Sequence, residues 1–179
     1  MTKCKICKTS FKKWSMTQKV CGSVECAEAY ARQIREKAER KELRARKEKL
    51  KTRREWLNEA QREFNRYIRE RDRNLPCISC GRFHLGSYDA GHYRSIGAAP
   101  QLRFDEDNCH KQCVPCNQHK SGNAIEFRRN LLRKIGHERV ERLEAAYCLV
   151  KWTIDDAKRI KAEYRAKYYA LCNDRKEAA

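Results

Sequence analysis

Apolar residues are distributed unevenly along the chain, and their spacing predicts where its helices lie. From residue 27 to residue 73 there is neither Gly nor Pro, and the composition is rich in Glu, Lys, Arg, Ala and Leu, which favours one long helix. The first half has too few apolar residues for a packed face, as in helices that bind a partner or bridge domains through solvent. In the second half, apolar residues form one stripe: Trp56, Leu57, Ala60, Phe64, Tyr67 and Ile68. We expect this stripe to pack on the segment that follows; a coiled-coil seam is the alternative, but heptads are not sustained.

The next segment has the composition of strands and turns. Pro76 ends the preceding helix, because the residue before a proline disfavours helical angles. Glycines and tyrosines are frequent between residues 77 and 104. We therefore place a hairpin there, with His92 on its second strand or just beyond it.

Helical periodicity returns after residue 123. Residues 124–135 are amphipathic and are followed by Gly136, a signal for a helix C-terminus. A short helix is expected over residues 138–149. Thr153 and Asp156 have the spacing of a capping box, and this box begins a final helix with one apolar side.

Charge narrows the class of partner. Lys and Arg number 42 against 24 acidic residues, a formal net charge of +18. Such an excess favours nucleic acid over a membrane surface or an acidic protein, although a solvated helical surface is the simpler alternative. Residues 77–123 are close to neutral, whereas the segments on either side are basic. The flanks would therefore supply affinity for a polyanion, and the central segment would supply chemistry.

The cysteines indicate metal sites. Two Cys-x-x-Cys pairs, separated by 32 residues, can place four thiolates around one structural zinc ion: Cys77, Cys80, Cys113 and Cys116. A redox role would need a thioredoxin-like context, which is absent. A second quartet near the N-terminus, Cys4, Cys7, Cys21 and Cys26, has the spacing of a small zinc knuckle. This knuckle would either only order the N-terminus or also contact DNA through its lysines. Cys109, Cys148 and Cys172 are expected to be buried small hydrophobes.

The chain should reside in a reducing compartment. The N-terminal residues lack the apolar region of a secretion signal, and no apolar run approaches the ~20 residues of a membrane span. Paired Cys-x-x-Cys motifs in a reducing compartment are typical of metal binding rather than disulfides. We therefore expect a cytoplasmic protein with no membrane partner.

Candidates for hydrolytic chemistry lie between the halves of the central quartet and directly after it. His92 is the candidate general base, because imidazole titrates near neutral pH. Asn117 directly follows the last cysteine, and its side-chain oxygen would help to hold a hard cation such as Mg2+, which polarises a phosphate; an N-cap role is the alternative. Asp89 is the candidate carboxylate ligand.

Further candidates surround these three. His119 and Lys120 follow Asn117 on the first turn, where metal ligation or phosphate contact is plausible. His110 is another possible ligand. Asn108 is expected to organise the loop before the second cysteine pair by hydrogen-bonding to backbone groups.

Together these features predict a mainly α chain with a small zinc-stapled ββα-metal (HNH-like) module and an N-terminal zinc knuckle. The expected segments are the knuckle at 1–26, a long basic helical arm at 27–75, the nuclease module at 76–123, and basic helices that pack on the module at 124–179.

Longer stretches of the sequence support this interpretation. The stretches Arg71–Cys80, Asp89–Arg94, Ala98–Phe104, Cys116–Asn123 and Trp152–Ile154 resemble the lambdoid phage NinG (Rap) recombination protein family over nearly the whole chain. This resemblance implies a structure-specific endonuclease that acts on branched DNA, such as D-loops and Holliday junctions, in phage recombination in the host cytoplasm. More distantly, the layout is similar to phage endonuclease VII-type resolvases, in which a metal-binding Asn directly follows the second cysteine pair.

One position departs from the common HNH pattern. In that pattern an Asp directly precedes the catalytic His, and here this position is Gly91. Asp89 shares its strand face but lies about 7 Å further back. Either the hairpin bends to bring Asp89 in, or His110 or His119 supplies the ligand.

The sequence leaves three functions open. The first is an endonuclease that depends on Mg2+, or on Mn2+ in its place, and acts on branched double-stranded DNA. The second is a non-catalytic zinc-containing DNA-binding recombination accessory protein, which Gly91 favours. The third is an RNA-binding zinc protein. A homodimer could present two active sites through the apolar stripes at 56–68 or 154–171, with packing inside one subunit as the alternative.

Overall fold

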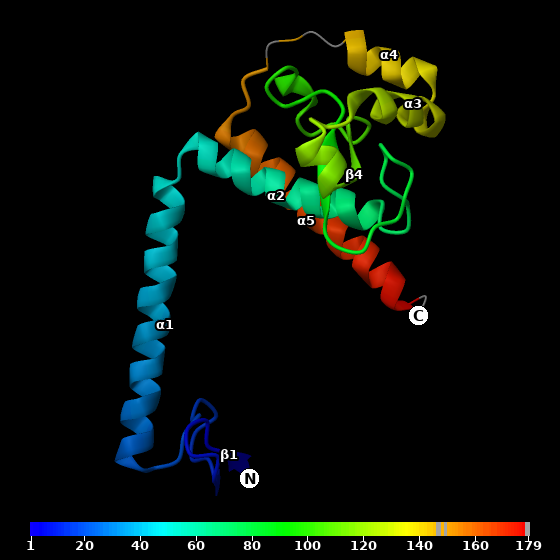
Figure 1. Cartoon of the computed structure of the whole chain (residues 1–179). Coiled ribbons are helices and arrows are strands. Elements are labelled where there is room, and N and C mark those ends of the chain that lie inside the picture. The colour runs from blue at the N-terminus through cyan, green and yellow to red at the C-terminus, as the bar shows by residue number, and fades with distance from the viewer. Residues whose placement is uncertain (146–147, 149, 178–179) are drawn as a thin grey trace. The chain divides into compact units, whose positions relative to one another are not determined.

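The computed structural model describes residues 1–145, 148 and 150–177, and the chain separates into two compact units, Met1–Lys51 and Thr52–Ala179. The first unit holds a two-stranded antiparallel sheet of β1 (Thr2–Lys3) and β2 (Ser10–Phe11), then α1 (Val24–Leu50) (Figure 1). The hydroxyl of Ser23 accepts a hydrogen bond from the backbone N–H of Cys26 and so caps α1. Cys26 is the buried residue of this helix, as its sparse apolar pattern predicts.

The single helix expected over residues 27–73 was wrong, because the helix is interrupted at Lys51 and Thr52. The second unit begins with α2 (Arg53–Arg71), whose start is fixed by a capping box. The Thr52 hydroxyl accepts from the N–H of Glu55, and the Glu55 carboxylate accepts from the N–H of Thr52 at 2.7 Å. These two bonds satisfy N–H groups that a continuous helix would have paired internally. The expected four-segment division of the chain stays a prediction.

The apolar stripe of α2 packs on the segment that follows it, as predicted, through Ala90, Phe104 and Cys109, and it forms the main core of the second unit together with α5 (Ile154–Glu177). The two helices pack side by side (Figure 1). The fully buried ring of Phe64 meets the ring of Tyr164 edge-on at 4.7 Å and that of Phe104 at 5.7 Å, favourable geometries for aromatic pairs. Part of each stripe is therefore buried within one chain, at Ala157, Ile160 and Tyr164 on α5, and the homodimer stays a prediction.

A second antiparallel sheet joins β3 (Tyr88–His92) to β4 (Cys109–Cys113), with Asp89 opposite Gln112 and Gly91 opposite His110. The hairpin expected within residues 77–104 was therefore wrong in its second strand, and His92 ends the first strand instead.

The strands are separated by a long connection that contains the short helix η1 (Pro100–Leu102). The side chain of Asn108 holds it: Nδ2 donates to the carbonyls of Arg94 and Leu102, and Oδ1 accepts from the N–H of Arg94. The loop-organising role predicted for Asn108 is confirmed.

Three further helical segments complete the unit: the π-helical turn η2 (Pro115–His119), α3 (Ala124–Ile135) and α4 (His137–Ala145). Gly136 ends α3 with φ of 84°, and its N–H donates to the carbonyl of Leu132, as the sequence predicts. The helix expected over 138–149 is described only as far as Ala145, and residues 146, 147 and 149 lie outside the described residues.

The final helix begins as expected. The Thr153 hydroxyl accepts from the N–H of Asp156, and the Asp156 carboxylate accepts from the N–H of Thr153. None of the helices described in the structure is long and apolar enough to cross a membrane.

Candidate functional site

Within each of the two cysteine quartets predicted from sequence, the four side chains come together in space. In each quartet the four sulfur atoms lie within 4.8 Å of one another. The Cys80 and Cys113 sulfurs are 3.9 Å apart, and those of Cys7 and Cys21 are 3.7 Å apart. Tetrahedral ligation at a Zn–S distance of about 2.3 Å implies a sulfur separation of roughly 3.8 Å. Both quartets could therefore hold a structural zinc ion.

The remaining cysteines follow their prediction in part. Cys109 is fully buried, as expected for a small hydrophobe. Cys148 is exposed and Cys172 is half-buried, so the prediction was wrong for these two. Cys148 lies in the segment between α4 and α5, and Cys172 lies past Tyr164, the last described residue of α5 that is buried.

The central quartet connects the elements that carry the candidate side chains. Cys77 and Cys80 come from the loop after α2, Cys113 is the last residue of β4, and Cys116 lies in η2. The N–H of Cys113 also donates to the Cys77 sulfur at 3.3 Å. A metal ion held by these four sulfurs would fix η2, and with it Asn117, against the end of the sheet.

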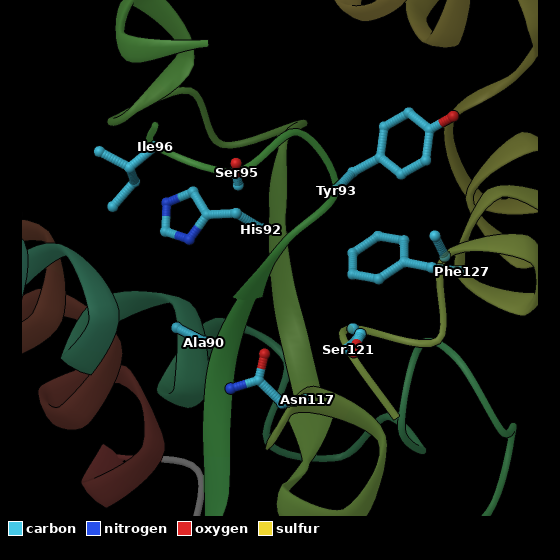
Figure 2. A pocket seen from close by; sticks show the side chains of 10 residues that line it. Ala90, His92, Tyr93, Ser95, Ile96, Asn117, Ser121 and Phe127 are labelled. Atoms are coloured by element: carbon cyan, nitrogen blue, oxygen red, sulfur yellow. The ribbon is translucent and has the colours of Figure 1, made fainter. Parts of the chain in front are cut away.

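His92 and Asn117 line one cavity of about 400 Å3 (Figure 2). The cavity lies between β3 and the start of α3, and Tyr93 and Phe127 form its apolar side. In Figure 2 the imidazole of His92 extends from β3 toward Ile96, on the side away from Tyr93 and Phe127, and the side-chain oxygen of Asn117 points along the strand toward the His92 end. The structure thus brings together the candidate base and the candidate oxygen ligand.

The hydrogen bonds of His92 define its tautomer. Its Nε2 lies 3.0 Å from the carbonyl oxygen of Arg103, and a carbonyl can only accept, so Nε2 carries the proton and Nδ1 keeps its lone pair. The Cys109 sulfur is 3.7 Å from Nδ1, a distance at which a thiol is only a weak donor. His92 therefore presents a basic nitrogen.

The surroundings of His92 favour its neutral form. Its ring lies 6.1 Å from the ring of Phe64, and the side chain is half-buried. Burial lowers the pKa of His92, and the nearby charge of Arg103 acts in the same direction, against the bond to the Arg103 carbonyl. A neutral imidazole at pH 7 is the form that a general base requires.

Asp89 lies beside Asn117. The Asn117 Nδ2 and the Gln118 Nε2 both donate to Asp89 Oδ2 at 2.8 Å. These bonds leave the Asn117 oxygen directed away from the carboxylate. Carboxylate and amide oxygens are ligand types that suit Mg2+ or Mn2+. Asp89 is held against Asn117, but the cavity that His92 and Asn117 share is lined without it.

Gly91 is required by a neighbour on the opposite strand. A Cβ at residue 91 would collide with Oε1 of Gln112 and would lie 2.9 Å from its Cδ. Gln112 is fully buried, and its Nε2 donates to Ser79 Oγ and to the Gly122 carbonyl at 2.6 Å each. The space in which an Asp at position 91 would begin is therefore occupied by an amide.

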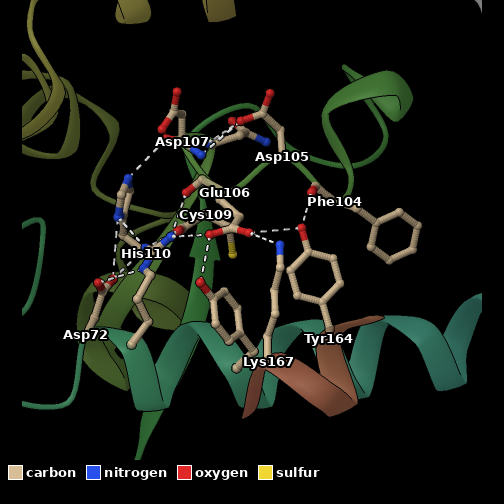
Figure 3. A network of polar contacts seen from close by, with 12 residues as sticks. Asp72, Phe104, Asp105, Glu106, Asp107, Cys109, His110, Tyr164 and Lys167 are labelled. Atoms are coloured by element: carbon tan, nitrogen blue, oxygen red, sulfur yellow. Dashed lines mark hydrogen bonds and ion pairs between the residues drawn. The ribbon is translucent and has the colours of Figure 1, made fainter. Parts of the chain in front are cut away.

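His110 faces away from the candidate base, in a buried polar network (Figure 3). Its Nε2 donates to the Asp107 carbonyl, while Arg71 and Lys134 both approach its Nδ1 at 2.9 Å. Burial lowers the pKa of His110, and the charges of Lys134 and Arg71 add to this effect against the contact with Asp72. With Nδ1 facing two cations, His110 has no lone pair free for a metal ion in this geometry.

Two other sequence candidates lie outside the cavity wall. His119 and Lys120 are exposed at the end of η2, and the cavity is lined without them. Their proposed roles in metal or phosphate contact stay predictions. The residues that sequence reasoning missed are Arg103, which acts through its carbonyl and leaves no side-chain signal, and Gln112.

Comparison with known proteins identifies the family of the chain. The family described as Bacteriophage Lambda NinG protein matches residues 1–174. The chain belongs to the NinG family. It is 55% identical to Protein ninG of Escherichia phage lambda over 121 residues, which cover 68% of this chain and 59% of that protein. The ninG proteins of Escherichia phage 933W and Salmonella phage P22 are each 54% identical over 121 residues, 60% of their length.

The resemblance to NinG proteins that the sequence suggested is thereby confirmed at the level of the family. The chain spans about 59–60% of the length of these curated relatives, and their names state no activity. No solved structure matches the chain. The residues of the site are therefore the evidence for the chemistry of this NinG chain.

Proposed function

We propose that this NinG-family chain is a metal-dependent endonuclease that cuts branched DNA, with its active site in a ββα-metal (HNH-like) module at residues 76–123. One observation carries the proposal: His92, whose Nδ1 keeps its lone pair with only the Cys109 sulfur near it and whose pKa is lowered, shares a cavity with Asn117, which is hydrogen-bonded to Asp89. A base beside oxygen ligands is the arrangement that hydrolysis of a phosphodiester needs.

The chain's own residues would act as follows. His92 Nδ1 accepts a proton from a water molecule, and the oxygen of that water attacks the phosphorus atom while the bond to the leaving oxygen breaks. The bond from Nε2 to the Arg103 carbonyl holds the ring and stabilises the imidazolium that forms. Asn117 and Asp89 would hold the cation, and Mg2+ or Mn2+ bound there supplies electrostatic stabilisation of the phosphate and the leaving oxygen. The two cysteine quartets would hold zinc in structural roles.

DNA as the substrate is supported by charge. The chain carries +18, and binding that neutralises several phosphates should weaken steeply with added salt. Preference for D-loops and Holliday junctions follows from the resemblance to phage recombination proteins. The host cytoplasm is the proposed place of action.

A cleavage assay on matched substrates tests this function. A labelled four-way junction and a linear duplex that shares its labelled strand are incubated with Mg2+, with Mn2+ and without added divalent cation. We expect cuts near the branch of the junction only when a divalent cation is present, and little cutting of the linear duplex. Tight junction binding without cleavage under either ion would refute the endonuclease.

The second candidate is a non-catalytic recombination accessory protein that binds DNA. Gly91 and the amide of Gln112 favour it, because they remove the carboxylate that directly precedes the base in the common HNH pattern. The assay above separates the two, since the accessory protein binds junctions and never cuts them. An RNA-binding role is separated by competition with double-stranded RNA.

A further inference from the structure

The N-terminal unit displays a tryptophan that contributes to no core. Trp14 is 87% exposed, and Met16 on the same loop is 94% exposed. Trp56, by contrast, is 8% exposed, and Trp152 packs against the main core. Large aromatic side chains are usually well buried, so a fully displayed one in so small a unit indicates a contact surface.

The loop that carries Trp14 is ordered by its own hydrogen bonds. The N–H of Trp14 donates to Gln18 Oε1 at 3.0 Å, and Gln18 Nε2 donates to the Val20 carbonyl at 2.9 Å. The hydroxyl groups of Ser15 and Thr17 lie 2.8 Å apart. The loop is also held between β2 and Cys21 of the first quartet. The backbone at Trp14 is therefore held in place, which limits the entropy lost by the loop when a partner binds.

A groove of about 500 Å3 lies beside this loop. Its apolar side comes from Trp14, Val20, Val24 and Ala27, and Val24 is itself 67% exposed. Polar groups that include Thr17, Gln18 and Glu28 also line the groove. Sites that hold small ligands typically have volumes of about 300–1,000 Å3, so this groove has room for a nucleobase and its sugar.

Lysines beside the groove, rather than in its wall, select the partner; the charged side chain in the wall is the acidic Glu28. Residues 1–24 contain six lysines and no acidic residue. Lys12, Lys13 and Lys19 flank the Trp14 loop and are exposed, and no ion pair involves them in this fully described unit. An apolar protein partner would not require this excess, whereas a chain of phosphates and bases would use both the lysines and the aromatic ring.

We propose that the Trp14 groove binds unpaired bases of DNA, with a base stacked on the indole ring and neighbouring phosphates held by Lys12, Lys13 and Lys19. Aromatic rings stack on bases of any sequence, so the groove would respond to strand opening rather than to sequence. The biological role of this groove rests on the proposed function, because D-loops and flexible branch points expose unpaired bases. The groove itself would bind unpaired bases whether or not the chain cuts DNA.

Fluorescence anisotropy of the full-length protein tests the groove. The probes are a labelled single-stranded DNA of about 16 nucleotides and the same strand in a duplex, both without added divalent cation. We expect Trp14→Ala to weaken single-strand binding about tenfold, within the range for loss of one stacked base, and to change duplex binding less than twofold. Trp14→Phe should keep most of the affinity. Bound zinc, measured for each variant, confirms that the knuckle is folded.

Intrinsic fluorescence provides a second readout. The single-stranded DNA should quench tryptophan emission of the parent protein and of Trp152→Phe, and should not quench emission of Trp14→Phe. Unchanged single-strand affinity in Trp14→Ala, equal losses for single strand and duplex, or tighter binding to RNA of the same sequence would each overturn the proposal, as would a change of oligomeric state in Trp14→Ala. Because no step here requires cutting, its failure is distinguishable from failure of the endonuclease.

Discussion

Gln112 on β4 occupies the space that a side chain on Gly91 of β3 would need. A Cβ at position 91 would meet Oε1, Cδ and Cβ of Gln112, the last two at 2.9 and 3.0 Å. The amide cannot simply turn away, because its Nε2 is bonded to Ser79 and to Gly122. The Oε1 atom is buried and has no hydrogen-bond partner among the described residues. Residue 91 therefore has to be glycine as long as the Gln112 side chain fills the space beside it.

This pairing predicts a non-additive stability change. Gly91→Ala should lower the free energy of unfolding by about 1–3 kcal/mol, the usual cost of overpacking. Combining it with Gln112→Ala should recover part of that loss, because the collision is removed. Denaturant unfolding of the two single variants and the double variant measures the coupling. Gly97→Ala, at a glycine with open space around it, is the control, and strictly additive effects would contradict the pairing.

Zinc content should follow the quartets. We predict two zinc ions per chain, with Cys7→Ser losing one and Cys113→Ser losing the other, because serine is a poor zinc ligand. Cys172→Ser makes the same atomic change at a cysteine outside both quartets and should keep both ions. Elemental analysis of purified protein decides this. Loss of the ion at Cys113 should also lower the unfolding temperature, since metal binding contributes to folding; two bound ions in Cys113→Ser would refute the site.

The lowered pKa of His92 predicts a pH dependence. Because burial favours the neutral ring, the imidazole should titrate below the ordinary value of about 6.5. If this base limits cleavage, the rate should rise with pH and reach its plateau at a pH below the ordinary histidine value of about 6.5. NMR titration of the His92 ring, assigned with His92→Gln, measures the midpoint without cleavage. A midpoint above the ordinary value would contradict the burial seen here.

Glu106 links the connection between β3 and β4 to α2 and α5, and its loss should destabilise the second unit. Its carboxylate accepts from Tyr67 at 2.9 Å and from Lys167 at 2.8 Å (Figure 3). Burial alone would raise its pKa, but the bonds from Lys167 and Tyr67 outweigh it and the pKa of Glu106 is lowered. We expect Glu106→Gln to cost about 1–2 kcal/mol, discounted for partial exposure. Glu138→Gln, at an exposed position on α4, is the control and should cost only about 0.3 kcal/mol.

The sign of this pKa shift gives a check on Glu106. Its ionised form is stabilised in the folded state, so its contribution is complete above the ordinary glutamate value of about 4.3 and is lost as the pH falls through the lowered value. The difference between the parent and Glu106→Gln should therefore shrink in acid. A difference that is constant from pH 7 to strongly acidic pH would show that the charge is not the cause.

Local signals in the sequence predicted much of the structure. The α2 stripe, the Gly136 helix end and the Thr153 capping box are patterns of residues a few positions apart, and all three are observed. Both quartets came together because metal-ligand spacing is itself a local pattern. The Thr52 capping box carries the same signal as Thr153 and was overlooked within a strongly helical composition.

Long-range partners could not be derived in the same way. The partner of β3 begins 17 residues after His92, and nothing in the intervening loop marks that distance. The carbonyl of Arg103 that sets the tautomer of His92 is a backbone group, which every residue has. A glycine inside a strand does indicate a close approach, so Gly91 could have suggested a bulky neighbour, but not that the neighbour was Gln112.

The most direct measurement is the single-turnover rate at which a bound four-way junction is cut by the parent protein and by His92→Ala in Mg2+. Junction affinity is measured in parallel, and His137→Ala, at an exposed histidine on α4, serves as the matched control. Loss of a general base should slow cleavage by about 10²–10⁴-fold while affinity stays within twofold, and His137→Ala should cut like the parent. If His92→Ala cuts as fast as the parent, the imidazole of His92 is not the base and the proposed chemistry is wrong.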